Sequence, residues 1–159
     1  MNKFKVALVQ YDTIEPENVE NTKLAIKLIK EAKRENADFV LFPEGFITSY
    51  SAPDVCEELR PLSEVEEDSE YQKWCQNALV EEGPELAAIC GIAKELSIGV
   101  CITGFSRGEK APRNTAWIID RDGKILLKYN KVHTCDWGWE GYLESGDDFP
   151  VCEFDGIKM

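Results

Sequence analysis

Residues 37–44 read Ala-Asp-Phe-Val-Leu-Phe-Pro-Glu, and this stretch decides how the chain folds. A short run of apolar residues that ends at a proline is typical of a buried strand. Pro43 has no backbone N–H and ends the strand, so the carboxylate of Glu44 is held directly behind it. The stretch therefore predicts a buried strand over residues 38–42 with a fixed acidic side chain at its end.

The residues before this strand predict a β-α-β unit. Residues 4–11 are apolar on both faces, which is typical of a central strand that is covered on both sides. Residues 18–36 carry apolar side chains at helical spacing, with lysines and glutamates on the opposite face. We therefore expect two parallel strands that are joined by a right-handed helical crossover.

The residues after the strand continue the alternation of helix and strand. A long segment reaches to about Glu82 and carries an acidic cluster between residues 64 and 70, which we interpret as a solvated surface. Gly83-Pro84 then begins a second amphipathic helix, because proline is favoured in the first helical turn. Residues 100–103 predict a third strand. No shift in composition divides the chain into two domains.

Two further strands, 114–120 and 125–130, are joined by a hairpin turn at Arg121-Asp122-Gly123. The connection from the third strand to the fourth is short, which predicts an antiparallel pair, and the hairpin reverses the chain again. The fifth strand should therefore run parallel to the second. Glu44 and Lys131 then emerge at one carboxyl edge of the sheet, where open α/β sheets bind ligands.

The side chains near this edge have chemical interpretations and structural alternatives. Glu44 can act as a general base, or it can cap a loop or pair with a lysine. Lys131 can stabilise a developing oxyanion, or it can be an ordinary lysine at a strand end. Residues 137–142 form an aromatic, glycine-rich loop that either lines a small-molecule pocket or folds over the core. The single histidine, His133, is interpreted as a packing or hydrogen-bonding residue.

Composition narrows the classes of function. The chain has 159 residues, a length typical of one domain, with 43% hydrophobic and 30% charged residues. Lysine and arginine total 18 against 30 aspartates and glutamates, and the formal net charge of −12 repels nucleic-acid phosphates and anionic lipids. The apolar stretches are too short to cross a membrane, and the N-terminus lacks the apolar core of a signal peptide. We therefore expect a cytoplasmic protein that binds neither nucleic acid nor membranes.

The cysteines and the histidine argue against a bound metal. Six cysteines are dispersed along the chain without a Cys-x-x-Cys pair, and one histidine leaves too few ligands for the usual zinc sites. The sequence also lacks a glycine-rich dinucleotide motif and a phosphate-loop motif. We expect reduced thiols, no metal and no other cofactor.

Several short motifs occur in a fixed order along the chain. They are residues 5–10, residues 37–44, Tyr50, Gly83-Pro84, Asn114-Thr115-Ala116, Asp122-Gly123, residues 129–133, Gly146-Asp147 and Phe154-Asp155-Gly156. In this order they resemble the N-terminal part of a carbon–nitrogen hydrolase of the nitrilase superfamily. No single motif is decisive, but the ordered set is specific and covers almost the whole chain.

The resemblance implies a fold and a mechanism. The fold is α/β, a nitrilase-like four-layer α-β-β-α sandwich, and residues 1–159 would be the N-terminal part of its single domain. In this family a cysteine thiolate attacks an amide or nitrile carbon, a glutamate moves the proton, and a lysine stabilises the tetrahedral intermediate. By motif position, Glu44 matches the general base and Lys131 matches the oxyanion-stabilising lysine.

The resemblance also implies further site residues and a substrate class. Glu140 is the best candidate for the family's second, substrate-positioning glutamate, and Glu144 is the alternative. Tyr50 and Trp137 are predicted to bind substrate. We expect a small-molecule amide, carbamoyl or nitrile substrate, with an amidase favoured over a nitrilase.

The nucleophile is the main departure from the family pattern. In the family it follows the next strand, shortly after a segment like residues 154–159, and neither Cys135 nor Cys152 has the required cysteine-aromatic-acid context. We expect a piece of a hydrolase that is inactive alone. The alternative is a nucleophile-free homologue that acts as a small-molecule-binding or partner subunit. Because half a sandwich exposes an apolar sheet face, we also expect a homo-oligomer, a complementary C-terminal part, or an incompletely covered sheet.

Overall fold

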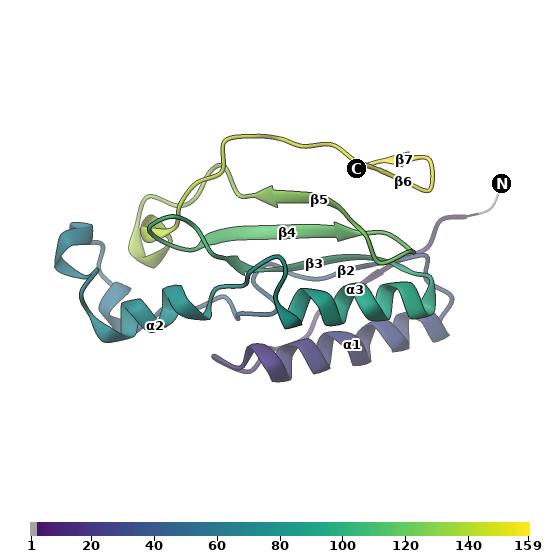
Figure 1. The fold of residues 1–159 in the computed structure, drawn as a ribbon, viewed down its shortest axis with the longest axis horizontal. Coiled ribbons are helices and arrows are strands. Elements are labelled where there is room, and N and C mark those ends of the chain that lie inside the picture. The colour runs from purple at the N-terminus through teal and green to yellow at the C-terminus, as the bar shows by residue number, and fades with distance from the viewer. Residues whose placement is uncertain (1–2) are drawn as a thin grey trace.

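The computed structural model describes residues 3–159, which form a mixed five-stranded sheet with helices along one face (Figure 1). The strands span Val6–Leu8 (β1), Phe39–Leu41 (β2), Gly99–Ser106 (β3), Arg113–Ile119 (β4) and Ile125–Asn130 (β5). They lie side by side in chain order, with β1, β2 and β3 parallel and with β4 and β5 each antiparallel to the preceding strand. As predicted, β5 therefore runs parallel to β2, and the two strands end at the same edge of the sheet.

Two helices, α1 (Asn18–Arg34) and α3 (Pro84–Leu96), pack side by side against the sheet (Figure 1). The apolar stripe of α1 buries Ala25 and Ile29, and α3 starts at the predicted proline and buries Ile89. Between the helices and the sheet lies the main core, which includes the fully buried Trp117 of β4. Each large aliphatic side chain buried there contributes about 1.5–3 kcal/mol, so this layer supplies most of the hydrophobic stabilisation.

The prediction that residues 4–11 form a central strand covered on both sides is wrong. Within residues 3–159, β1 lies at the edge of the sheet and has a neighbouring strand on one side only. Ala7 and Val9 pack against the helix-covered core, whereas Val6 and Leu8 are 43% and 74% exposed. Apolar residues on both faces of a strand indicate two apolar surfaces, but they do not indicate how many strands or layers cover them.

The face opposite the helices is covered over only part of its area. A C-terminal hairpin, β6 (Glu153–Phe154) and β7 (Ile157–Lys158), lies on this side of the sheet (Figure 1). It places the Phe154 ring 5.2 Å from the Phe39 ring, and Gly99 permits this approach because a Cβ atom there would lie 2.4 Å from Phe154. Leu8 and Leu41, partners in the β1–β2 register, stay exposed. The expectation of an incompletely covered sheet is therefore confirmed.

The long segment after β2 contains helices that the sequence pattern does not predict. They are η1 (Asp54–Cys56), η2 (Leu62–Glu64) and α2 (Ser69–Asn77), and a further short helix, η3 (Gly138–Tyr142), follows β5. The Asp68 carboxylate accepts the first free backbone N–H groups of α2, which is the usual way to stabilise a helix start. Tyr71 of α2 and Tyr142 of η3 share a second small buried cluster. The packing fixes the aromatic loop against this segment.

Four of the five acidic residues between positions 64 and 70 are exposed, as their interpretation as a solvated face requires, whereas Asp68 is partly buried at the start of α2. Residues 3–159 contain no group of three or more His, Cys, Asp or Glu side chains arranged to hold a metal ion. Within the same range, no helix combines the length and the apolar character needed to cross a membrane.

Candidate active site

Lys131 joins two carboxylates at the carboxyl edge of the sheet. Its ammonium group donates one hydrogen bond to Glu44 Oε1 and one to Glu140 Oε1, each at 2.9 Å. Lys131 directly follows β5, Glu44 follows β2, and Glu140 belongs to η3. Three segments far apart in the sequence therefore meet at these side chains, which we call the lysine–carboxylate cluster.

The local backbone holds Glu44 at this edge. The Phe42 N–H donates to the Cys101 carbonyl at 3.0 Å and extends the pairing of β2 with β3. The carbonyl of Pro43 accepts a hydrogen bond from the Thr103 hydroxyl. Gly45 has a φ of +68°, a left-handed conformation that glycine adopts at little cost, so the chain turns away directly after Glu44. The Glu44 side chain is left half exposed and open to a ligand.

Asn114 contacts both Glu44 and Lys131. Its buried side-chain amide donates to Glu44 Oε1, and its backbone carbonyl accepts the Lys131 N–H at 2.8 Å. The amide and the Lys131 ammonium thus converge on a single carboxylate oxygen of Glu44. The motif of residues 114–116 marks this segment in the sequence, but a positioning role for the asparagine could be found only from the structure.

Glu140 is the most enclosed member of the lysine–carboxylate cluster, with a side chain that is 5% exposed. Its Oε1 also accepts the Tyr50 hydroxyl at 2.6 Å, and its Oε2 accepts the Cys135 N–H at 2.9 Å. Burial by itself raises the pKa of Glu140, but the hydrogen bonds from Lys131, Tyr50 and Cys135 outweigh burial and lower the pKa to about 2. Glu140 is therefore a permanent negative charge near neutral pH.

The partners of Glu140 are shifted in a way that keeps this arrangement intact. Burial by itself lowers the pKa of Lys131, but the hydrogen bonds to Glu140 and Glu44 raise that pKa above its usual value. Burial, followed by the hydrogen bond to Glu140, raises the pKa of Tyr50. The ammonium and the phenol therefore both keep their protons across the physiological range.

The two tryptophans of the aromatic loop lie in different environments. The ring of Trp139 packs 4.8 Å from the ring of Tyr50, next to the lysine–carboxylate cluster. Trp137, which the sequence predicts as a substrate-binding residue, is 71% exposed, and among residues 3–159 it has no ring-to-ring contact. The structure thus brings Tyr50 to the site and leaves Trp137 at the surface. The Trp-Gly-Trp pattern contains no signal that distinguishes the two rings.

The alternative second glutamate, Glu144, lies in a different network. One of its carboxylate oxygens accepts the backbone N–H groups of Lys110 and Ala111, and the other pairs with Arg113 at 3.0 Å. Burial opposes these interactions, but they outweigh it and lower the pKa of Glu144. Glu144 therefore holds the loop between β3 and β4, and of the two candidates only Glu140 contacts Lys131.

Comparison with known proteins identifies the family. The family model described as carbon–nitrogen hydrolase matches residues 5–159. The chain belongs to the carbon–nitrogen hydrolase family. It is 30% identical to omega-amidase NIT2 of Xenopus tropicalis over all of this chain and 54% of that protein. It is 31% identical to N-carbamoylputrescine amidase of Oryza sativa over 90% of this chain and 42% of that protein. The chain thus spans about half the length of the curated relatives it matches.

Solved structures support the same assignment at the level of the fold. An amidase from Nesterenkonia sp., a member of the nitrilase superfamily, superposes with a TM-score of 0.74 and 20% sequence identity. The match covers 98% of this chain and 53% of the amidase chain. The predicted nitrilase-like α/β fold is therefore confirmed, and coverage of about half is consistent with an N-terminal portion.

Within residues 3–159, Cys135 is the only cysteine whose backbone contacts the lysine–carboxylate cluster. A nucleophilic cysteine acts as a thiolate and needs a lowered pKa. The hydrogen bond to the anionic Glu140, followed by burial, instead raises the pKa of the Cys135 thiol. The surroundings of Cys135 therefore disfavour the reactive form.

Proposed function

We propose that the chain carries the glutamates and the lysine of a hydrolase site for non-peptide carbon–nitrogen bonds. The observation that carries the proposal is the position of the Lys131 ammonium, 2.9 Å from a carboxylate oxygen of Glu44 and of Glu140. Family membership and the names of two relatives, an omega-amidase and an N-carbamoylputrescine amidase, support small amides and N-carbamoyl compounds as substrates. Nitriles are the less favoured class.

In the proposed reaction, a cysteine that lies outside residues 1–159 is the nucleophile. Glu44 removes the thiol proton, the thiolate attacks the amide carbon, and the carbonyl electron pair moves onto oxygen. Lys131 stabilises that oxyanion through its fixed positive charge. When the intermediate collapses, the carbon–nitrogen bond breaks and the proton on Glu44 passes to the leaving nitrogen, which departs as ammonia or an amine.

Hydrolysis of the thioester completes the proposed cycle. Glu44 takes one proton from water as the hydroxyl attacks the thioester carbon, and this proton returns to the sulfur when the carbon–sulfur bond breaks. Glu140 transfers no proton in this scheme. Because its pKa is about 2, it stays ionised and holds Lys131 in position, while Tyr50 holds Glu140. We propose that Tyr50 also contacts the substrate, and that Trp137, which is exposed but belongs to the same loop as Glu140, contacts it as well.

We further propose that residues 1–159 are the N-terminal part of one hydrolase domain and that another layer covers the apolar face around Leu8 and Leu41. Leu8 is 74% exposed and Leu41 is 40% exposed in this chain. Exposed apolar sheet faces favour association, so the covering layer is either a complementary C-terminal part or a second copy of the chain.

The test is ammonia release from butyramide, measured for the chain 1–159 and for the product of its complete coding sequence. We expect no turnover by the chain alone and turnover by the complete product. Loss of a general base typically costs about 10²–10⁴-fold, so Glu44→Gln should lower kcat/KM by about 10³-fold. The control is Glu95→Gln, which changes an exposed carboxylate of α3 far from the site and should leave kcat/KM unchanged.

Two outcomes would redirect the proposal. Turnover by residues 1–159 alone that disappears in Cys135→Ala would make Cys135 the nucleophile. A complete product that binds butyramide but hydrolyses no amide, N-carbamoyl or nitrile compound would favour the alternative function, a nucleophile-free binding or partner subunit.

A further inference from the structure

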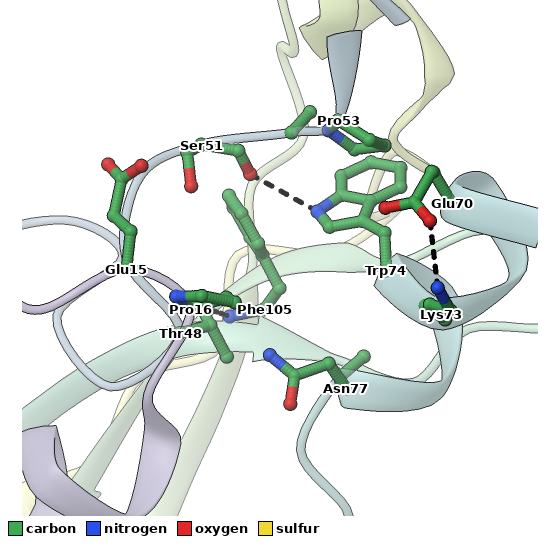
Figure 2. Close-up of a pocket in the computed structure, with 12 residues that line it drawn as sticks. Glu15, Pro16, Thr48, Ser51, Pro53, Glu70, Lys73, Trp74, Asn77 and Phe105 are labelled. Carbon is green, nitrogen blue, oxygen red and sulfur yellow. Dashed lines mark hydrogen bonds and ion pairs between the residues drawn. The ribbon is translucent and has the colours of Figure 1, made fainter. Parts of the chain in front are cut away.

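A cavity of about 400 Å³ lies between residues 48–53, residues 15–16 just before α1, and α2 (Figure 2). The rings of Trp74 and Phe105 form its aromatic wall, with centroids 6.0 Å apart and planes inclined at 77°. No member of the lysine–carboxylate cluster lines it. The rings of Tyr50 and Trp139 pack behind Phe105 and connect the wall to that cluster. The volume falls in the range of small-molecule sites.

Each side-chain nitrogen that lines this cavity has a hydrogen-bond partner. The Trp74 indole N–H donates to the Ser51 carbonyl at 3.2 Å, and the Lys73 ammonium is paired with Glu70 at 2.8 Å, as Figure 2 shows. The side-chain N–H of Asn77 donates to an asparagine side chain of α1 at 3.2 Å. Because Glu70 balances the charge of Lys73, no unpaired cation among residues 3–159 lines the cavity to attract an anionic ligand.

Three side-chain groups with acceptor oxygens that line the cavity are free. Within residues 3–159, the Glu15 carboxylate, the Asn77 side-chain oxygen and the Ser51 hydroxyl have no hydrogen-bond partner, and Glu15 has no ion pair. Glu15 and Ser51 lie on one side of the Phe105 ring, and Trp74 lies on the other (Figure 2). The cavity therefore combines an aromatic surface with one unpaired negative charge and two neutral acceptors.

We propose that this cavity binds an organic ammonium ion with an apolar body, at a site separate from the lysine–carboxylate cluster. The ammonium group donates to the free acceptors and faces the unpaired charge of Glu15. The apolar body lies against Trp74 and Phe105, and a cation near an aromatic face gains a further electrostatic attraction. The net charge of −12 raises the local concentration of cations around the whole protein. The inference does not depend on the proposed hydrolase function.

The test is isothermal titration of the chain with three ligands of matched shape: 2-phenylethylammonium, the neutral 2-phenylethanol and the anionic 3-phenylpropionate. We expect the ammonium ion to bind about 5-fold more tightly than the alcohol, and the carboxylate to bind most weakly. The indole N–H resonance of Trp74, identified by its loss in Trp74→Phe, should shift during the titration with the ammonium ion.

Two variants test whether the Glu15 carboxylate is the group that interacts with the ammonium group of the ligand. Glu15→Gln should weaken binding of the ammonium ion about 3-fold and leave binding of the alcohol unchanged. The matched control, Glu95→Gln, removes the same charge from the surface of α3 and should change neither affinity. Since Glu15 is exposed, its replacement leaves the fold intact, and far-UV circular dichroism verifies this.

Three results would overturn the inference. One is equal or tighter binding of the alcohol or the carboxylate. Another is the absence of saturable binding of the ammonium ion up to about 20 mM, which corresponds to almost no affinity. The third is loss of binding in Glu44→Gln with no effect of Glu15→Gln, since the ammonium ion would then occupy the lysine–carboxylate cluster instead of the cavity.

Discussion

A cation lies between two carboxylates at each end of the sheet, and the two arrangements do different things. At the end where β2 and β5 finish, the cation is Lys131, and at the opposite end, in the β4–β5 turn, it is Arg121. The two cationic side chains are equally accessible, at 27% and 26% exposed. Charge composition and exposure of the cation therefore do not distinguish a candidate catalytic site from a structural contact.

The Arg121 end is a clamp between segments. The guanidinium group contacts Asp155 at 2.8 Å and Asp38 at 3.1 Å, donates to the Ser97 carbonyl, and lies 5.4 Å from the centre of the Phe154 ring. A planar guanidinium satisfies several acceptors at fixed angles, and it does not lose its proton in proteins. Both carboxylates are substantially exposed, so the clamp joins the hairpin of β6 and β7 to the sheet without a buried charge.

The Lys131 end is asymmetric, and this asymmetry is what a catalytic site needs. Glu140 is enclosed and bound by three donors, whereas Glu44 is half exposed and shares one oxygen between Lys131 and Asn114. One carboxylate is thus fixed as a permanent charge, and the other is open to a substrate. The unequal environments of Glu140 and Glu44, more than the presence of an ion pair, therefore indicate a candidate catalytic site at this end of the sheet.

The largest effect on stability should follow from Glu140→Gln. Removing one member of an enclosed ion pair leaves Lys131 without its better partner and weakens the contacts of Tyr50 and Cys135. We expect the free energy of unfolding to fall by about 2–3 kcal/mol, measured by urea denaturation at pH 7. Glu95→Gln serves as the exposed control, with a change below about 0.5 kcal/mol. A decrease below about 0.5 kcal/mol for Glu140→Gln would show that the enclosed ion pair of Lys131 contributes no more to stability than an exposed one.

A smaller effect is expected for Arg121→Met. Exposed ion pairs contribute about 0–1 kcal/mol each, so the loss of this clamp should lower the free energy of unfolding by about 1 kcal/mol. Amide hydrogen exchange should become faster in residues 152–159 and stay unchanged near Lys131. Lys124→Met, in the same turn, is the matched control. A destabilisation equal to that of Glu140→Gln would show that both ends serve the fold alike.

The loss of stability in Glu140→Gln should depend on pH, because Glu140 has a lowered pKa. The pKa of Glu140 is lowered from its ordinary 4.5 to about 2, so its contribution to stability is fully present above about pH 5. The contribution is lost as the pH falls from about 4.5 towards 2, because the folded state must then bind a proton that the unfolded state already holds. The difference in unfolding free energy between wild type and Glu140→Gln should therefore stay constant from pH 8 to 5 and shrink below pH 4.5. A difference that already declines at pH 6 would contradict the lowered pKa.

The sequence predicts the relative directions of β2 and β5 and the meeting of Glu44 with Lys131. Both follow from connection lengths and strand ends, because each short connection reverses the chain and each strand end fixes which residue emerges next. Connection lengths and strand ends do not predict that β1 lies at the edge of the sheet, because the neighbours of a strand are set by packing between distant segments.

The contact of Asn114 with Glu44 and the orientation of the two tryptophan rings depend on geometry that the local sequence pattern does not indicate. The Asn114 amide reaches Glu44 only because β4 lies in a particular register with its neighbours. Gly138, which has a left-handed φ of +58°, lies between the two tryptophans of the aromatic loop, so their rings do not follow a simple alternation. Contacts of this kind could be found only once the segments were placed together.

The central claim is that Lys131, and not its counterpart Arg121, belongs to the reaction centre. The most direct measurement is kcat/KM for butyramide hydrolysis by the product of the complete coding sequence, with Lys131→Arg compared with Arg121→Lys. Both variants keep the charge. Because oxyanion stabilisation depends on the position of the charge, we predict a loss of about 10²–10³-fold for Lys131→Arg and less than about 3-fold for Arg121→Lys. Equal losses, or a larger loss for Arg121→Lys, would contradict the account.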